Sequence, residues 1–325
     1  MVHRNLAVYF LLGASRPGPT PLTLQEALEK AKIRLTETGR VNELRIENVG
    51  DEEVFLHAGD IVKGGWQDRT LSVSLILQPH SGEIPIASFC VEARRWAARS
   101  KEDASSFAAS SRAVPSREMK LAMHEALRRP TEPEARHQVS QQDKSRPGIA
   151  VSETSVRQRR IWDGVRLTQE KLTRNLGQAV EARASVTSLE LSLDNDELHK
   201  AITGYSEILL PAGEKQDDIV GTVFAINGRI SIADLYPSNG LFRKMWKKQL
   251  HAGTIEAIGE QDATALPTPA VRDVEAFLAG RNTTVVSERD IAGETQILTR
   301  ESDQILVVEA HNPAAFVHRT YLAKW

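Results

Sequence analysis

Two apolar runs joined at Asn227-Gly228 constrain the fold of this chain more than any other feature. Together they form the stretch "DIVGTVFAINGRISIADLYP". The Asn-Gly dipeptide supplies the positive φ angles that a tight type I′ turn requires. The sequence therefore predicts a β-hairpin here, so the fold must contain antiparallel strands in the second half of the chain.

The first hundred residues predict a largely β region with one early helix. Leu6–Leu12 reads as a strand, and residues 24–35 keep apolar side chains at helical spacing after Thr23, a suitable N-cap. Alternating apolar and polar residues on both sides of "VGDEE" predict a hairpin. The runs "TLSVSLILQP" and "GEIPIASFCVE" predict a second hairpin by the same pattern.

The middle of the chain changes composition and then becomes helical. Residues 97–151 are rich in Ala, Ser, Arg, Gln and Pro, so we expect a peripheral or flexible insert there. Apolar residues at near-helical spacing from about 153 to 184 predict one long helix. A helix over 238–250 and two or three final strands are expected to follow.

The order of strands, helices and strands favours an α+β fold with a mixed or largely antiparallel sheet, several helices and one long helix in the middle of the chain. The chain has 325 residues, which exceeds a typical domain. We nevertheless expect a single large domain over residues 1–325, with 97–151 as an insert within it.

Charge and cysteine content exclude several classes of protein. A formal net charge of -2 disfavours a nucleic-acid or membrane partner. Residues 92–174 carry 18 Lys and Arg against 11 Asp and Glu, but aromatic residues are sparse among them, so solvated helix faces are the favoured interpretation. The single cysteine, Cys90, excludes an internal disulfide, and the N-terminal sequence lacks the pattern of a signal peptide. We expect a cytoplasmic protein.

The stretch "HAGDIVKGGWQDRT", residues 57–70, combines three glycines with two carboxylates, a lysine and an arginine. Glycines permit close backbone approach, so exposed N–H groups there could cradle an anion beside Lys63 and Arg69. The spacing matches neither the dinucleotide fingerprint nor the phosphate loop. A glycine-rich turn with a surface ion pair explains the stretch equally well.

A second polar cluster lies in "FCVEARRW", at the end of a predicted strand. Cys90 and Glu92 fall on the same face of an extended strand. A neighbouring carboxylate raises the pKa of a thiol and withholds the thiolate, so a buried structural cysteine is favoured over a nucleophile.

Four motifs in order along the chain resemble the ARG and Rhodanese-Phosphatase-superfamily-associated protein domain family, in which ARG stands for ADP-ribosylglycohydrolase. They are "GDIVKGGWQDR", "CVEARRW", "QRRIWDGV" and "GTVFAINGRISIADLYPSNGLFRKMWKKQL". The resemblance implies a role in the metabolism of ADP-ribose or another NAD derivative, and it makes proteins of the ADP-ribosylglycohydrolase pathway candidate partners. It implies no particular reaction.

The resemblance also indicates candidate site residues. Asp60, Asp68 and Glu92 are the candidate catalytic carboxylates, and they could hold Mg²⁺ beside phosphates. In a nucleotide site, Arg69 and Arg95 would pair with the diphosphate and Trp96 would stack on the base. The remaining candidate ligand-binding residues are Gly59, Lys63, Gly64 and Gln67. The motifs also carry over Gln158, Trp162, Asn227, Gly228 and Asp234.

Two functions stay open. The first is the binding or processing of an ADP-ribose-like small molecule, including hydrolysis; the second is a non-catalytic accessory module that binds a partner. No known nucleophile or acid–base pair is recognisable, which favours the second. We expect no protein metal site, because histidines at positions 57, 80, 124, 137, 199, 251, 311 and 318 are scattered without ligand spacing.

Overall fold

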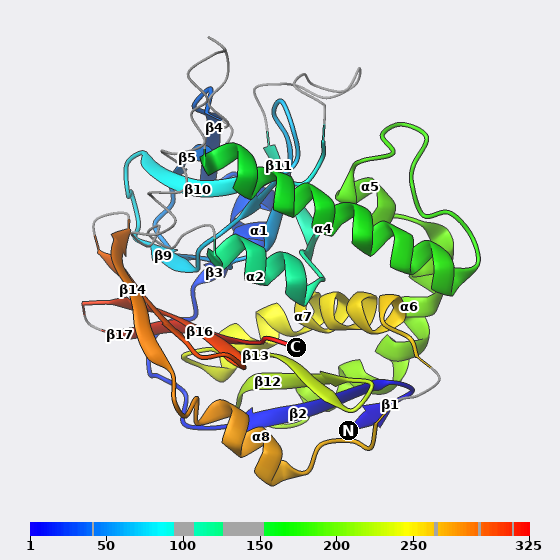
Figure 1. The fold of residues 1–325 in the computed structure, drawn as a ribbon. Coiled ribbons are helices and arrows are strands. Elements are labelled where there is room, and N and C mark those ends of the chain that lie inside the picture. The colour runs from blue at the N-terminus through cyan, green and yellow to red at the C-terminus, as the bar shows by residue number, and fades with distance from the viewer. Residues whose placement is uncertain (41, 94–106, 126–152, 263–265, 292–293, 314) are drawn as a thin grey trace, which may run out of the picture.

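The computed structural model describes residues 1–325 except 41, 94–106, 126–152, 263–265, 292–293 and 314. Its strands form an eight-stranded, a six-stranded and a three-stranded sheet. Helices lie between the two larger sheets (Figure 1). The α+β class and the largely antiparallel sheets predicted from the sequence are confirmed.

The eight-stranded sheet joins the two ends of the chain. The predicted hairpin forms its centre, where Ile226 pairs with Arg229 and the turn residues Asn227 and Gly228 have φ angles of 51° and 77°. From one edge to the other, its strands are β1 Val2–His3, β2 Leu6–Leu12, β12 Ile219–Ile226, β13 Arg229–Leu235, β17 Ala315–Ala323, β16 Ile305–Asn312, β15 Thr295–Glu301 and β14 Thr284–Ile291.

The other two sheets come from the first 113 residues. The six-stranded sheet has the order β11 Phe107–Ala113, β7 Asp60–Gly64, β8 Arg69–Leu71, β10 Ile84–Cys90, β5 Glu43–Asn48 and β4 Ile33–Glu37. The three-stranded sheet has the order β3 Leu22–Thr23, β6 Val54–Leu56 and β9 Leu75–Leu77. Strands β3 and β6 are parallel, whereas the other pairs in these two sheets are antiparallel.

The sequence assigned some of these strands to the wrong partners. A hairpin around "VGDEE" was expected, but β5 and β6 lie in different sheets. The second expected hairpin forms only in part: β8 pairs with β10, but β9 pairs with β6 in the three-stranded sheet. Alternation of apolar residues identifies strands but not their partners, because pairing depends on the rest of the sheet.

The helices have these bounds: α1 Leu24–Glu29, α2 Arg117–Glu125, α4 Glu153–Leu176, α5 Leu189–Leu193, α6 Asp196–Leu209, η1 Leu210–Glu214 (a 3₁₀ helix), α7 Asn239–Gly259 and α8 Val271–Leu278. The predicted long middle helix is α4, which ends where Gly177 adopts a φ of 71°. No helix among the described residues is long and apolar enough to cross a bilayer.

Helix α1 is shorter than the apolar spacing predicted. Thr23 caps it in a capping box with Glu26, as expected, but the helix ends at Glu29. Ala31 has a φ of 51°, which reverses the chain, and β4 then pairs with β5. Ile33 and Leu35 fit a helix and a strand equally by spacing, and burial on one face of β4 decides between them.

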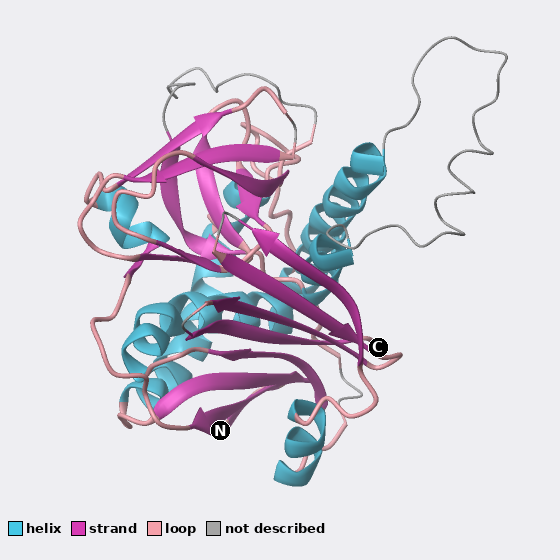
Figure 2. Cartoon of the chain, turned by 90° about the vertical axis from the view of Figure 1, so that its left-hand side faces the viewer, coloured by secondary structure: helices cyan, strands magenta, loops and turns pink. Residues whose placement is uncertain are grey.

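Helix α7 is the central element of the fold. It packs on β2 and β12 of the eight-stranded sheet and also contacts β11, α4 and α6 (Figure 2). Phe242, Met245 and Leu250 on this helix are at most 1% exposed. Burial of each such side chain contributes about 1.5–3 kcal/mol, so α7 holds the layers together.

Residues 107–125 correct part of the expected peripheral insert. They form β11 and α2, and Val114, Met119 and Met123 are fully buried in the main core. Helix α2 presents these methionines to α4 at helical spacing, which the surrounding polar composition obscured. The rest of the expected insert, 97–106 and 126–151, lies outside the described residues.

Candidate functional site

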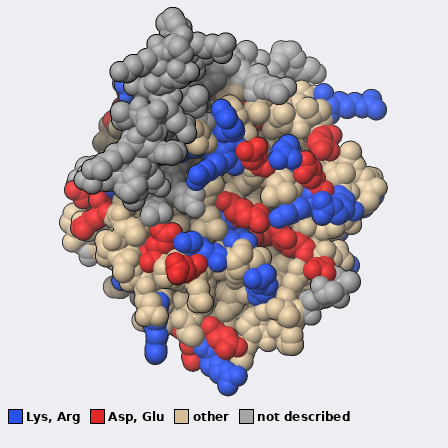
Figure 3. All heavy atoms as spheres, viewed as in Figure 1, with Lys and Arg blue, Asp and Glu red and all other residues tan. Residues whose placement is uncertain are grey.

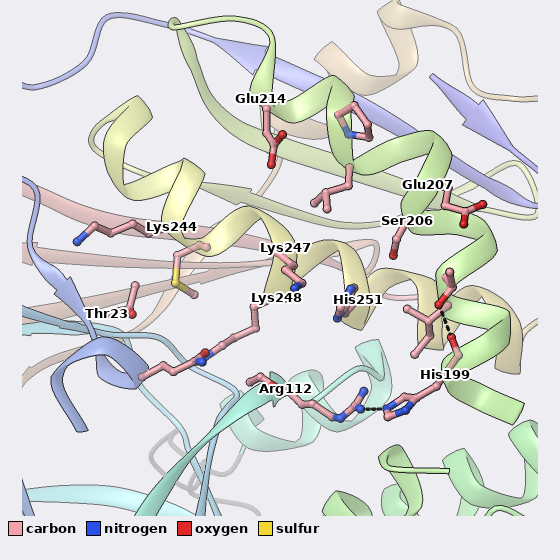
Figure 4. A pocket seen from close by; sticks show the side chains of 17 residues that line it. Thr23, Arg112, His199, Ser206, Glu207, Glu214, Lys244, Lys247, Lys248 and His251 are labelled. Carbon is pink, nitrogen blue, oxygen red and sulfur yellow. Dashed lines mark hydrogen bonds between the residues drawn. The ribbon is translucent and has the colours of Figure 1, made fainter. Parts of the chain in front are cut away.

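A cavity of about 650 Å³ opens beside α7 and is enclosed by α1, β11, α6 and η1 (Figure 4). Its polar walls carry Thr23, Gln25, Ser111, Arg112, His199, Thr203, Ser206, Glu207, Glu214, Lys244, Lys247, Lys248 and His251. Ile202, Leu210, Pro211 and Met245 supply the apolar part. The volume falls within the range of cavities that hold small-molecule ligands.

One face of α7 gives the cavity its positive charge. Lys244, Lys247, Lys248 and His251 follow the spacing i, i+3, i+4, i+7, so they share one side of the helix (Figure 4). Ser238 caps the helix at its start, which fixes this register. Most apolar residues of α7 face the core, whereas its basic face lines the cavity.

The cations of the cavity differ in how fully they are neutralised. Lys248 is buried and its Nζ lies 2.9 Å from Asp60 Oδ1. Lys244 Nζ lies 2.9 Å from Glu26 Oε2. Lys247 is exposed and makes no ion pair with any residue in the described part of the chain. This lysine is therefore available to a bound anion.

Strand β11 places a further cation opposite α7. Arg112 contacts His199, and its guanidinium lies 3.4 Å from Asp194 Oδ1. Burial lowers the pKa of His251 to about 4, and the charges of Lys247 and Arg112 act in the same direction. The imidazole of His251 is thus neutral at pH 7, because the cavity disfavours another positive charge. Exposed Glu207 and Glu214 lie on the opposite wall.

The glycine-rich stretch 57–70 forms β7, a turn and the start of β8 rather than an open loop. Asp68 Oδ1 accepts a hydrogen bond from the Gly64 N–H at 3.2 Å, which closes the turn. A Cβ on Gly65 would lie 2.4 Å from Phe107 Cζ, so only glycine fits there. The side chain of Asp68 is thereby engaged in holding backbone.

The two cations of this stretch make ion pairs within the protein. Arg69 is fully buried, and its guanidinium lies 2.7 Å from Glu37 Oε2 on β4. Lys63 Nζ lies 2.5 Å from Glu190 Oε1. Gln67 is also buried, and Gly59 and Gly64 have positive φ angles of 99° and 113°. None of these residues lines the 650 Å³ cavity.

The first and second motifs lie next to each other in the fold. Cys90 pairs with Arg69 across β8 and β10, and the Val91 N–H donates to the Asp68 carbonyl at 3.0 Å. Cys90 and Glu92 are fully buried, which agrees with a structural cysteine. Arg95 and Trp96 lie outside the described residues.

Gln158 from the third motif also serves this junction. Its side-chain amide accepts from the Cys90 N–H at 2.9 Å and donates to the Cys90 carbonyl at 2.8 Å. The pair of bonds ties α4 to the end of β10, as a neighbouring strand would. The place where the three motifs meet is thus a buried structural contact. Asp60, from the first motif, connects it to the cavity through its ion pair with Lys248.

The structure brings together one group of potential metal ligands among the residues it describes: His57, Asp234 and His318. Their nearest ligand atoms lie within 4.8 Å of one another, and all three side chains are buried. Asp60, Asp68 and Glu92, the carboxylates considered for Mg²⁺, do not belong to this group. Two histidines that are far apart in the sequence, His57 and His318, therefore lie close together in the fold.

Within the basic region 92–174, the described cations fall into two groups: Arg112, Arg117 and Lys120 are buried, whereas cations of α4 lie nearer the surface and pair with carboxylates. On α4, Arg166 lies 2.6 Å from Glu170, and Lys171 lies 3.3 Å from Glu118. Over the described part of the face in Figure 3, acidic and basic side chains are interspersed. These two cations of α4 are thus paired with neighbouring carboxylates.

The basic face of α7 was not among the residues predicted for the site, although the sequence contains its signal. The fourth motif ends in "FRKMWKKQL", and the i, i+3, i+4 spacing of its three lysines predicts one basic helix face. Arg112 had no comparable signal, because it reaches the cavity only through the pairing of β11 with β7.

A protein-family model, described as the ARG and Rhodanese-Phosphatase-superfamily-associated Protein domain, matches residues 1–322. No curated protein and no solved structure matches the chain.

Proposed function

Because this chain belongs to the ARG and Rhodanese-Phosphatase-superfamily-associated protein domain family, whose name associates it with ADP-ribosylglycohydrolases, we propose that it binds or processes an ADP-ribose-like nucleotide. The single observation that carries the proposal is the basic face of α7, which lines a cavity of about 650 Å³ together with Arg112. The ligand site is therefore placed at this cavity instead of the glycine-rich stretch.

The chemistry of the cavity suits a diphosphate. Lys247 and the guanidinium of Arg112 offer charge-assisted hydrogen bonds to phosphate oxygens. The apolar side formed by Ile202, Leu210 and Met245 suits the ring system of a nucleoside. Ser206 and Glu207 on α6 are placed to bind ribose hydroxyls.

The candidate catalytic carboxylates differ in their relation to this cavity. Asp60 lies next to it through Lys248, whereas Asp68 is engaged in closing a turn. Glu92 is fully buried at the junction of the motifs. Asp60 is therefore the carboxylate we retain as the candidate acid–base group, with Lys248 as its ion-pair partner.

Isothermal titration with ADP-ribose tests the binding site. Lys247→Glu reverses an exposed charge, so we expect an affinity loss of about tenfold to hundredfold with unchanged unfolding. Arg272→Glu is the matched control, because Arg272 is 88% exposed on α8 and does not line the cavity. Equal affinity for both variants and the wild type would place the site elsewhere.

A second measurement separates the enzyme from the accessory module. Phosphorus NMR of ADP-ribose incubated with the protein and Mg²⁺ follows the diphosphate directly. Conversion to phosphate monoesters that is lost in Asp60→Asn shows hydrolysis at this site. Tight binding with an unchanged spectrum supports the accessory module, whose function is to hold the nucleotide or present it to a partner.

A further inference from the structure

The buried group formed by His57, Asp234 and His318 lies apart from the cavity discussed above. His57 follows β6 of the three-stranded sheet, whereas Asp234 and His318 lie on the neighbouring strands β13 and β17 of the eight-stranded sheet. We propose that these three side chains bind a divalent transition-metal ion of the zinc class, and that the ion joins the two sheets.

The distances fit a site that needs little rearrangement. His318 Nε2 lies 3.2 Å and His57 Nε2 lies 3.9 Å from Asp234 Oδ1. Zinc binds imidazole nitrogen and carboxylate oxygen at about 2.0–2.2 Å, so two of its ligand atoms lie about 3.4 Å apart. The full spread of 4.8 Å requires a contraction of about 1.4 Å between the two most distant ligand atoms, within reach of rotamer adjustment.

Hydrogen bonding within the group is incomplete in a way that an ion would resolve. Asp234 is 2% exposed, and its carboxylate oxygens receive no hydrogen bond of regular geometry from the residues described, although the two imidazoles lie close to it. His318 Nε2 is close to this carboxylate but is not aligned to donate to it, and it has no other hydrogen-bond partner in the described structure. A buried carboxylate costs several kcal/mol unless cations compensate it. Buried Lys120 acts on Asp234 electrostatically, and a bound metal ion would compensate the carboxylate directly.

An aromatic residue and a small cavity lie next to the three side chains. Tyr236 packs on the His318 ring at 5.1 Å between centroids, and its buried hydroxyl has no hydrogen-bond partner among the described residues. A cavity of about 20 Å³, lined by His318 and His124, adjoins the group. It has room for one water molecule, which can serve as the fourth ligand.

The ligand set selects the class of ion. Two imidazoles with one carboxylate suit zinc, cobalt or iron, whereas Mg²⁺ and Ca²⁺ prefer ligand sets made only of oxygens. Because the three side chains are at most 2% exposed, the site is closed to large ligands. This closure favours a structural ion that bridges the sheets. The proposed site is connected to the α7 cavity through Asp60, whose Oδ2 accepts a hydrogen bond from the His57 N–H at 3.1 Å and whose Oδ1 lies 2.9 Å from Lys248 Nζ.

Cobalt binding to the full-length protein, stripped of metal by chelation and dialysis, tests the proposal. Co²⁺ bound to imidazole and carboxylate gives visible absorption bands, and we expect saturation at one equivalent per chain and displacement by Zn²⁺ but not by Mg²⁺. The thermal midpoint should rise with added Zn²⁺, since binding to the folded state alone stabilises it.

Single-ligand variants locate the site. His57→Gln and Asp234→Asn should each weaken Co²⁺ binding by more than about a hundredfold, which is the upper loss seen on removing outer-shell partners alone. His80→Gln, which alters an exposed histidine paired with Asp51, should bind as the wild type does. Circular dichroism confirms that each variant is folded. If the wild type fails to bind Co²⁺ and Zn²⁺, or if folded His57→Gln retains full affinity, the proposal is wrong.

Discussion

Replacement of Arg69 by methionine tests whether the glycine-rich stretch is structural. Arg69 is fully buried, and the Glu37 side chain 2.7 Å from it is 9% exposed. Removing one partner of a buried pair costs about 3–5 kcal/mol, because the remaining charge stays in a medium of low polarity. Glu37 keeps one donor, the Trp66 N–H at 3.1 Å, so we expect the lower end, about 3 kcal/mol.

Urea unfolding measures this loss, with Arg34→Met as the matched control. Arg34 pairs with Glu47 across β4 and β5, but its side chain is 61% exposed, so its loss should cost under about 1 kcal/mol. Glu37→Gln combined with Arg69→Met should recover part of the stability, because the charge of Glu37 is then removed as well. The reasoning is refuted if Arg69→Met unfolds like the wild type while its affinity for ADP-ribose falls.

Two further changes probe the fold. Burial raises the pKa of Glu256 from 4.5 to about 7, so the folded state holds a proton that the unfolded state releases, and stability falls as the pH rises from about 4.5 through 7. Glu256→Gln should remove up to about 3 kcal/mol of that decline in the free energy of unfolding. Urea unfolding of both proteins at pH 5 and pH 8 measures the decline, and an equal decline in both would contradict the prediction. In Gly228→Ala, the new Cβ would lie 2.3 Å from the Leu266 carbonyl oxygen at a φ of 77°, so we expect a larger loss of thermal midpoint than in Gly177→Ala, which has a φ of 71° and nothing within 4 Å. Similar losses in both variants would show that the contact is unimportant.

The sequence predicted features whose causes are local. The turn at Asn227-Gly228 needs only two residues of suitable φ, and the caps Thr23 and Ser238 need only their neighbouring N–H groups. Most strand pairings could not be predicted from the sequence. For example, β5 and β6 are separated by one short connection, yet they join different sheets. What decides between partners is burial against elements that are distant in the sequence.

The residues of the candidate sites also differ in whether local sequence spacing predicts them. The lysines of α7 share a face by helical spacing alone, so their convergence was readable. His57, Asp234 and His318 meet only because β13 pairs with β17 and β6 packs nearby, and no local spacing encodes this. The stretch 57–70 is dense in polar residues, but Arg69 is buried and paired with Glu37, and Lys63 pairs with Glu190, so neither cation lines the cavity.

The strand order of the eight-stranded sheet has a consequence for synthesis of the chain on the ribosome. The central hairpin of β12 and β13 is flanked by β2 from the N-terminal end and by β17 from the C-terminal end. Strand β2 therefore emerges long before its partner β12 exists, and β13 keeps an open edge until β17 has been translated. Sheets assembled from such distant segments form slowly and expose unpaired edges meanwhile. A nascent chain halted before residue 315 would present that edge of β13 to the surrounding proteins, which makes premature termination here an aggregation hazard.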